Sequence, residues 1–354
     1  MTVRIGVIGT GFARRVQIPA LTLVPGTRVT AIASGHRANA AAAARDLGIQ
    51  RVYENGAELV VSPDVDLVLV SSTPDTHAAF AIAALEAGKH VLCEKPTALN
   101  AREAEAMVAA ARRHPDRVSW MDHQLRYEPN RRRVRELVRQ GTIGEVRHLE
   151  LSLKPYLRGD GRPQTGDAPW TWWFDRAKGG GLLGAVGSHL IDLCRFWTGA
   201  ETVHATGTAQ AFVQRRRDGA GTLREVSADD FASFVLRLSS GAVATVTLSA
   251  VAHHGPGHVA QITGSAGTVV LTGERTLELA PAGEPLRDAS VPDDLWERTT
   301  PNNMWARSFV RLMRDLVRTL ETGVPEGEPA TFEDGLAVQR VLDAVRAGPG
   351  ASLD

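Results

Sequence analysis

The chain has 354 residues, and because a single hydrophobic core rarely grows to that size, two domains are expected. Its 40 Lys and Arg balance its 40 Asp and Glu, which excludes the strongly basic proteins that bind nucleic acid or anionic membranes by charge alone. Cys93 and Cys194 are too few for a disulfide framework and suit a reducing cytoplasm. No apolar run reaches the length of about 18 residues that crosses a membrane, so no membrane partner is expected.

The first part of the chain alternates short apolar runs with segments of helical composition. The runs are almost continuously apolar, as in strands that are buried on both faces of a parallel sheet. Repeated strand–helix units favour right-handed crossovers, so residues 1–123 are predicted to form a doubly wound α/β domain. The predicted strands are Val3–Gly9, Arg28–Ser34, Val65–Ser71, Lys89–Glu94 and Arg117–Asp122.

From residue 124 onward the pattern changes. A helix over Glu128–Gly141 and a strand over Glu145–Lys154 precede a run of alternating strands with short Ser-Gly, Ala-Gly and Gly-Glu turns, typical of antiparallel hairpins. Residues 124–354 are therefore predicted to form an α+β domain with a mostly antiparallel sheet. The strands within Phe231–Leu271 carry apolar residues at alternating positions, and an open sheet face must be covered, so a homodimer or homotetramer through this sheet is expected.

The first strand runs directly into the sequence GVIGTGFARR, which leads into a helix. Gly9 permits a tight turn there, and Gly11 lets the backbone approach a pyrophosphate at the helix N-terminus. The third glycine position of this fingerprint is occupied by Arg14, beside Ala13. The alternative is that these glycines form a turn that binds no ligand. The position of the motif directly after the first strand favours dinucleotide binding. The predicted cofactor-binding residues of the turn are Gly9, Thr10, Gly11, Phe12 and Ala13.

The end of the second predicted strand indicates which dinucleotide is preferred. An acidic residue normally lies there and binds the ribose 2′-hydroxyl, whereas this chain has Ser34, His36 and Arg37. A 2′-phosphate needs hydrogen-bond donors and positive charge. The interpretation is NADP(H) in preference to NAD(H); the alternative is that Arg37 merely begins a surface helix.

Glu94, Lys95 and Pro96 follow the fourth predicted strand, at the edge where α/β sheets bind ligands. The proline ring keeps Lys95 out of the helical conformation, so its ammonium could be aimed at a nicotinamide ribose or a substrate hydroxyl. The alternative is a surface lysine in a turn.

Several segments together resemble the Gfo/Idh/MocA family, the group of glucose–fructose oxidoreductase and inositol dehydrogenase. They are GVIGTGFARRVQIPAL, SSTPDTHAAFAIAALEAGKHVLCEKPTAL, HQLRYEPNRRRVRELVRQGTIGEV, WWFDRAKGGGLLGAVGSHLID and TFEDGLAVQRVLDA. The resemblance covers essentially the whole chain and implies a Rossmann domain, a second domain with a large open sheet, and Lys95 as the active-site lysine. It also implies cofactor contacts by Ser72, Thr73, Pro74, His77, Glu94 and Lys95.

The segment Gly179–Trp197 holds a glycine run followed by a helical pattern. In the family the run is usually followed by an aspartate and, four residues later, by the histidine that transfers a proton; here these positions are Ala185 and His189. An imidazole suits general acid/base catalysis near neutral pH. His189 is thus the second predicted catalytic residue, and the alternative is a buried histidine in a core helix. The glycines are expected to allow close backbone approach rather than to bind phosphate.

The predicted substrate-binding residues surround this segment. The tryptophans can stack on a sugar ring or simply pack under a loop. His253 and His254 have no partner at metal-ligand spacing, so no metal site is expected. The predicted substrate contacts are Arg126, Tyr127, Trp172, Trp173 and Asp192.

The resemblance implies an NAD(P)-dependent oxidoreductase that acts on a hydroxyl or carbonyl group of a sugar, cyclitol or related compound. Two alternatives stay open: a redox-neutral enzyme that uses its cofactor only transiently, for elimination or glycoside cleavage, and a non-catalytic nucleotide-sensing regulator. Ala185 in place of the usual aspartate favours both alternatives, whereas Lys95 and His189 argue against the regulator.

Overall fold

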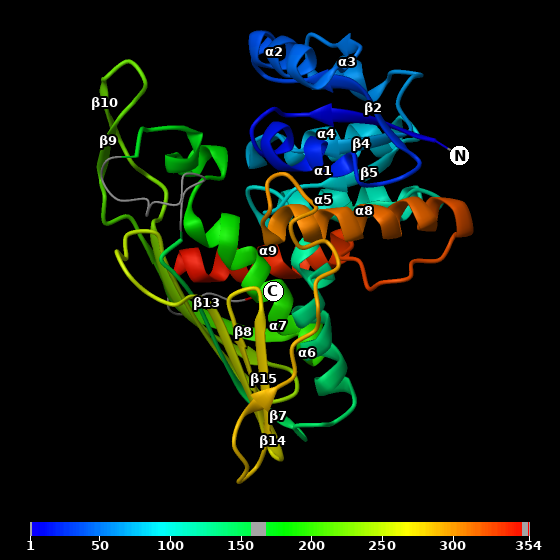
Figure 1. Cartoon of the computed structure of the whole chain (residues 1–354). Helices are drawn as coiled ribbons and strands as arrows, with labels where there is room; N and C mark the ends of the chain where they lie inside the picture. Colours follow the sequence, from blue (N-terminus) through cyan, green and yellow to red (C-terminus); the bar gives the residue numbers. More distant parts are fainter. Residues whose placement is uncertain (1, 157–167, 349–352, 354) are drawn as a thin grey trace. The chain divides into compact units, whose positions relative to one another are not determined.

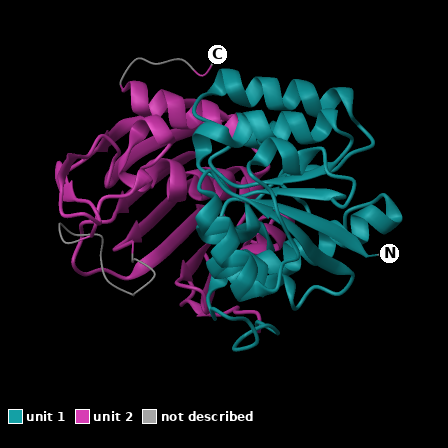
Figure 2. Ribbon diagram, turned by 90° about the horizontal axis from the view of Figure 1, so that it is seen from above, with its two compact units in different colours: residues 1–128, 293–336 teal, residues 129–292, 337–354 magenta. Residues whose placement is uncertain are grey.

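The computed structural model describes residues 2–156, 168–348 and 353, and it divides the chain into two compact units (Figure 2). Unit 1 comprises residues 1–128 and 293–336, and unit 2 comprises residues 129–292 and 337–354. The predicted boundary at residue 123/124 differs from this division mainly because residues 293–336 group with unit 1. Within them, α8 (Met304–Thr322) buries Phe309 and Leu316 in one apolar cluster with Ile5 and Leu67 of the first sheet.

Unit 1 contains a six-stranded parallel sheet in the order β3-β2-β1-β4-β5-β6. This order, which reverses at β1, confirms the predicted doubly wound fold. The sequence pattern did not predict β3, because two residues are too short to show a periodicity. The strands are β1 (Val3–Ile8), β2 (Thr27–Ala33), β3 (Arg51–Val52), β4 (Leu67–Val70), β5 (His90–Cys93) and β6 (Ser119–Met121).

Apolar side chains project from both faces of this sheet, because successive residues of a strand point to opposite sides. Leu67 and Leu69 belong to one buried cluster, and Val68 and Val70 belong to another. Helices cover both faces, which explains why the strands read as continuously apolar. Besides α8, the helices of this unit include α1 (Ile18–Leu21), α2 (Arg37–Leu47), α3 (Gly56–Val60), α4 (His77–Glu86) and α5 (Ala101–Arg113) (Figure 1).

The described part of unit 2 contains an eight-stranded sheet in the order β16-β15-β14-β13-β7-β12-β11-β8. Neighbours are antiparallel except β7 and β12, so the predicted mostly antiparallel sheet is confirmed. A separate hairpin pairs β9 (Arg215–Arg217) with β10 (Leu223–Glu225). The strands of the large sheet are β7 (Val146–Lys154), β8 (Thr202–Gln210), β11 (Phe231–Leu238), β12 (Val243–Ser249), β13 (Gly257–Gly264), β14 (Gly267–Thr272), β15 (Thr276–Pro281) and β16 (Arg287–Asp288).

The large sheet has one face packed against helices and one face with exposed apolar residues. Phe234 and Leu236 of β11 are buried, whereas Val235 between them is 39% exposed and Val243 of β12 is 38% exposed. The covering helices are α6 (Pro129–Arg139) and α7 (Ser188–Thr198), and α9 (Phe332–Ala347) ends the helical part of the chain (Figure 1). The predicted assembly through the exposed face stays a prediction.

Candidate active site

The turn after β1 contains two glycines with different surroundings. Gly9 has a φ of 114°, and a Cβ atom on it would lie 2.1 Å from the backbone oxygen of Ser71. Only glycine fits there, because a side chain would have to displace the main chain that follows β4. A Cβ atom on Gly11 would meet no atom within 4 Å. Gly11 therefore borders open space, as the approach of a pyrophosphate requires.

The helix after this turn begins as the π-helix η1 (Ala13–Gln17) and continues as α1. Ala13 is fully buried, whereas Arg14 is exposed and forms an ion pair with Asp46. The close packing that the fingerprint assigns to its third glycine thus falls on Ala13. Phe12 is half-buried, and its ring centroid lies 5.9 Å from Nζ of Lys95.

The residues after β2 form a corner in which Ser34 is buried and His36 and Arg37 are exposed. The Ser34 hydroxyl accepts a hydrogen bond of 3.3 Å from the N–H of His36. Arg37 begins α2, and its Nε lies 2.5 Å from Oε1 of Glu54. Glu54 follows the short strand β3, so no sequence pattern indicated that it would be the partner of Arg37.

His77 connects the loops after β4 and β5. Its Nδ1 lies 2.9 Å from the carbonyl oxygen of Pro96, and its Nε2 lies 3.2 Å from that of Ser72. Burial lowers the pKa of His77, so the ring is neutral and its single N–H donates to one of the two carbonyls. The ring therefore forms a hydrogen bond to one of these two loops, and the tautomer decides which. Cofactor contacts by the loop that contains Thr73 and Pro74 stay a prediction.

Lys95 lies directly after β5, with 16% of its side chain exposed. Its Nζ is 3.6 Å from Oε2 of Glu94, and the same oxygen accepts a hydrogen bond of 3.1 Å from the backbone N–H of Lys95. The buried carboxylate of Glu94 thus restrains both the main chain and the ammonium group of the predicted active-site lysine.

Glu94 belongs to a buried polar cluster that the sequence analysis missed. The amide nitrogen of Gln17 donates hydrogen bonds of 2.9 Å to Oε1 of Glu94 and 2.8 Å to Oδ2 of Asp122. Burial and the neighbouring Glu94 raise the pKa of Asp122 well above its usual range, against the opposing effects of Gln17 and Lys95. Two carboxyl groups in one buried site disfavour each other's ionisation, so the charged form of Asp122 is disfavoured beside Glu94.

Arg126 and Tyr127 lie on the short helix η3 (Gln124–Tyr127), and both are buried. Nη2 of Arg126 lies 3.1 Å from Oδ1 of Asp334, and the Tyr127 hydroxyl donates a hydrogen bond of 2.6 Å to Oδ2 of Asp315. Asp315 lies on α8 and also accepts hydrogen bonds from two backbone N–H groups of the loop that follows α8. These residues therefore have structural partners within unit 1, and their contact with substrate stays a prediction.

In unit 2, the helix after the glycine run also begins as a π-helix, η6 (Leu183–Gly187), before it continues as α7. His189 lies in the first turn of α7 and is 1% exposed, and Asp192 is buried one turn later. Ala185, at the position of the family's aspartate, lies within the π-helix and is half-buried.

The glycine run before η6 is surrounded by protein. A Cβ atom on Gly180 would lie 2.3 Å from the backbone oxygen of Trp173, and one on Gly181 would lie 2.4 Å from Oδ1 of Asp229. Oδ2 of Asp229 accepts a hydrogen bond of 2.6 Å from the N–H of Leu183, so this carboxylate caps the start of the helix. Burial raises the pKa of Asp229. No local pattern indicated Asp229, because it lies 46 residues after Leu183 in the chain.

The two predicted aromatic contacts differ in exposure. Trp172 is 41% exposed, whereas Trp173 is half-buried and stacks on Tyr156 with the ring centroids 5.8 Å apart. The two indole rings meet edge to face at 6.2 Å. Trp173 thus packs within the protein, and Trp172 offers the more exposed ring surface.

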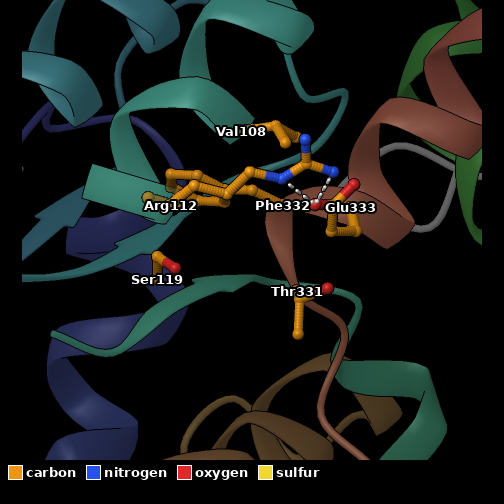
Figure 3. Close-up of a pocket in the computed structure, with 7 residues that line it drawn as sticks. Val108, Arg112, Ser119, Thr331, Phe332 and Glu333 are labelled. Carbon is orange, nitrogen blue, oxygen red and sulfur yellow. Dashed lines mark hydrogen bonds and ion pairs between the residues drawn. The ribbon is translucent and has the colours of Figure 1, made fainter. Parts of the chain in front are cut away.

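A small surface pocket of about 180 Å³ lies elsewhere in unit 1. Figure 3 shows Arg112 and Glu333 pointing toward one another at this pocket, and their ion pair measures 2.7 Å. Ser119, which also lines it, is the first residue of β6, so the pocket lies at the amino end of that strand. Dinucleotides bind outside the carboxyl ends of the strands, so this pocket does not correspond to the predicted cofactor site.

Among the residues that the structure describes, no group of three or more His, Cys, Asp or Glu side chains could hold a metal ion. No described helix is both long and apolar enough to cross a membrane.

Two family models match the chain. Residues 3–121 match the oxidoreductase family with an NAD-binding Rossmann fold, and residues 131–270 match the GFO/IDH/MocA C-terminal domain.

Known proteins are similar over nearly the whole length. Glucose-fructose oxidoreductase domain-containing protein 2 of Xenopus laevis is 31% identical, with 97% of this chain and 90% of that protein covered. An oxidoreductase domain protein from Kribbella flavida has a crystal structure with 30% identity and a TM-score of 0.84, covering 97% of this chain and 96% of that one. Levoglucosan dehydrogenase, solved with NADH and levoglucosan, has the same fold at 23% identity, with a TM-score of 0.84 and coverage of 98% and 96%.

Proposed function

Because the chain belongs to the Gfo/Idh/MocA family of NAD-binding oxidoreductases, we propose that it transfers a hydride between a nicotinamide dinucleotide and a hydroxyl or carbonyl group of a sugar, cyclitol or related compound. The observation that carries the proposal is the arrangement of residues at the carboxyl ends of the strands of the parallel sheet. There, Gly11 borders open space at the start of a helix, and Lys95 follows β5 with its ammonium group restrained by Glu94.

The first unit supplies the groups that would hold the dinucleotide. The backbone of Gly9–Ala13 fits a pyrophosphate, because the turn combines open space at Gly11 with the start of a helix. The loop Ser72–Pro74 and Glu94 follow strands at the same edge. We infer NADP(H) in preference to NAD(H) from Ser34, His36 and Arg37, while the NADH bound by levoglucosan dehydrogenase supports a nicotinamide dinucleotide of either kind.

The proposed catalytic residues are His189 and Lys95. In the direction of oxidation, His189 is proposed to take the hydroxyl proton, and the Lys95 ammonium is proposed to stabilise the negative charge that develops in the reaction. When bound, the oxidised nicotinamide ring supplies the chemistry that accepts the hydride from the carbon. Ala185 supplies no carboxylate to His189, so the imidazole acts without the aspartate that the family resemblance implies.

The remaining proposals concern substrate and surroundings. Unit 2 is proposed to bind the substrate, with Trp172 as its most exposed aromatic contact and Trp173 and Asp192 as further contacts. Arg126 and Tyr127 of unit 1 are also proposed as substrate contacts. The exposed face of the large sheet is proposed to mediate a homodimer or homotetramer, as apolar Val235 and Val243 on that face favour burial. The proposed location is the cytoplasm.

Ala185 favours one alternative function, a redox-neutral enzyme that keeps its cofactor bound. The test is to incubate the purified chain with NAD⁺ or NADP⁺ and a panel of sugars and cyclitols while recording nicotinamide absorbance. Continuous cofactor reduction supports the proposed dehydrogenase. Substrate conversion with no net change of cofactor supports the alternative, and binding without any conversion contradicts both enzymes.

A further inference from the structure

The corner after β2 holds a carboxylate that the strand itself does not supply. No acidic residue follows β2 directly, but β3 pairs with β2 in parallel register, with Ile32 opposite Val52. Glu54 follows Val52 by two residues, just as Ser34 follows Ile32. The N–H of Tyr53 still donates a hydrogen bond of 3.0 Å to the carbonyl of Ile32, so the segments that continue β2 and β3 stay adjacent up to that point.

At this corner Glu54 forms an ion pair with Arg37. Oε1 of Glu54 lies 2.5 Å from Nε of Arg37, and the two side chains are 59% and 61% exposed. Solvent and a ligand can therefore reach both. Exposed ion pairs contribute little to stability, typically less than about 1 kcal/mol, so this pair can open without unfolding its surroundings.

The two groups have opposite affinities for the two forms of the cofactor. A carboxylate accepts hydrogen bonds from ribose hydroxyls and repels a 2′-phosphate, whereas a guanidinium binds a phosphate in a bidentate manner. A 2′-phosphate therefore competes with Glu54 for the positive charge of Arg37, while a free ribose makes no such demand. The ion pair thus opposes recognition of the 2′-phosphate more than recognition of the free ribose.

We propose that Glu54 is a specificity-determining residue: by holding Arg37 and presenting its own charge at the end of β2, it sets the ratio of NADPH to NADH affinity. The inference rests on the proposed use of a nicotinamide dinucleotide. It assigns a role to a residue outside the glycine fingerprint and outside the segment Ser34–Arg37.

The experiment measures the dissociation constants of NADH and NADPH separately, by calorimetric titration of the full chain. Glu54→Gln keeps the size of the side chain and removes its charge. We expect NADPH to bind about tenfold more tightly to this variant, because Arg37 is released and the repulsion is gone, while NADH binds equally well or more weakly. The NADPH to NADH ratio therefore shifts toward NADPH by about tenfold or more.

A matched control separates this effect from a general loss of negative charge. Asp64→Asn removes the acid of another ion pair, in which Oδ2 of Asp64 lies 2.9 Å from Nη2 of Arg51 at the start of β3. We expect its ratio to stay within about twofold of that of the original chain. In an Arg37→Gln background, Glu54→Gln should produce a smaller gain, because only the repulsion between the carboxylate and the phosphate is then removed.

Three results would overturn the inference: a ratio unchanged by Glu54→Gln, an equal shift caused by Asp64→Asn, or a gain that is as large without Arg37 as with it. If the original chain binds neither dinucleotide, the proposed function fails, and the inference fails with it. That result is distinct from the other three, in which binding is observed.

Discussion

Two segments of this protein begin in the same way. In unit 1, Gly9 has a φ of 114° and precedes the five-residue π-helix η1; in unit 2, Gly181 has a φ of 111° and precedes the five-residue π-helix η6. Both π-helices continue as α-helices, and both lead to a buried polar side chain, Gln17 in the first case and His189 in the second. π-Helical turns are frequent at functional sites.

The surroundings of the two turns differ. Gly11 in the first turn borders open space, whereas Gly180 and Gly181 in the second lie against the backbone of Trp173 and the carboxylate of Asp229. A run of glycines therefore has two possible uses, and the atoms opposite the missing Cβ distinguish them. The first turn is suited to admit a ligand, and the second allows protein to pack closely at the start of the helix that bears His189.

The largest expected effect tests whether the second segment serves chemistry at all. His189→Ala should lower turnover by about 10²–10⁴-fold, the usual contribution of a general acid or base, and leave NADH affinity nearly unchanged. Turnover is measured on a substrate found in the absorbance screen. Cys194→Ala, a change to another buried side chain of α7, is the control and should keep its turnover. Full activity in His189→Ala would mean that α7 is only a packed helix.

The second prediction compares Gly9 and Gly181, the positive-φ glycines that precede the two π-helices. Gly9→Ala should destabilise the chain by about 3 kcal/mol or more, because its Cβ meets main-chain atoms that cannot move away. Gly181→Ala should cost less, since the nearest atom belongs to the movable carboxylate of Asp229. Urea denaturation measures both free energies of unfolding. A larger loss for Gly181→Ala would contradict this interpretation of the two turns.

The third prediction compares Gly11, which lies two residues after Gly9, with Gly180, which directly precedes Gly181. Gly11→Ala should weaken NADH binding by about tenfold, since its Cβ would occupy the space proposed for the pyrophosphate, and should leave stability nearly unchanged. Gly180→Ala should do the opposite: it should destabilise the chain by about 1–3 kcal/mol and leave NADH affinity unchanged. Titration with NADH and urea denaturation of both variants provide the comparison. Equal NADH affinities in the two variants would contradict it.

The smallest expected effect concerns the cluster around Gln17. The pKa of Asp122 is raised in the folded chain, so above its unfolded value of about 3.9 the folded state holds a proton that the unfolded state has lost. This group therefore makes the free energy of unfolding fall as pH rises above about 4. Asp122→Asn keeps the hydrogen-bond pattern without titrating, so its stability relative to the original chain should rise by about 1 kcal/mol or more between pH 4 and pH 8.

The control for this prediction is Asp288→Asn, because hydrogen bonds from Ser290 lower the pKa of that exposed carboxyl. Its folded state holds the proton less tightly, so the stabilisation from this carboxyl is lost as pH falls below its unfolded value of about 3.9 and is complete above about pH 5. The stability of Asp288→Asn relative to the original chain should therefore stay nearly constant between about pH 5 and pH 8. A difference between Asp122→Asn and the original chain that is constant with pH would mean that Asp122 is ionised in the folded state.

Much of the fold could be predicted because it depends on local patterns. The five apolar runs of unit 1 contain strands of its sheet, and the alternating pattern after residue 230 marks the antiparallel strands of unit 2. Two motif residues were also placed correctly at strand ends, Gly9 after β1 and Lys95 after β5, and His189 lies in a helix as its pattern predicted. Each of these positions can be read from a few neighbouring residues. The short strands β3 and β16, by contrast, exist only because a longer strand lies beside them.

The sequence by itself determined which residues end strands, where glycine is required in the chain, and which polar groups follow the strands at one edge of the first sheet. Only the tertiary structure decided which distant groups meet. It placed Gln17 between Glu94 and Asp122, Glu54 against Arg37, and Asp229 at the start of the helix that bears His189. The physical reason is that strand order and helix packing bring together side chains far apart along the chain, and burial then sets their charge, as it does for Asp122.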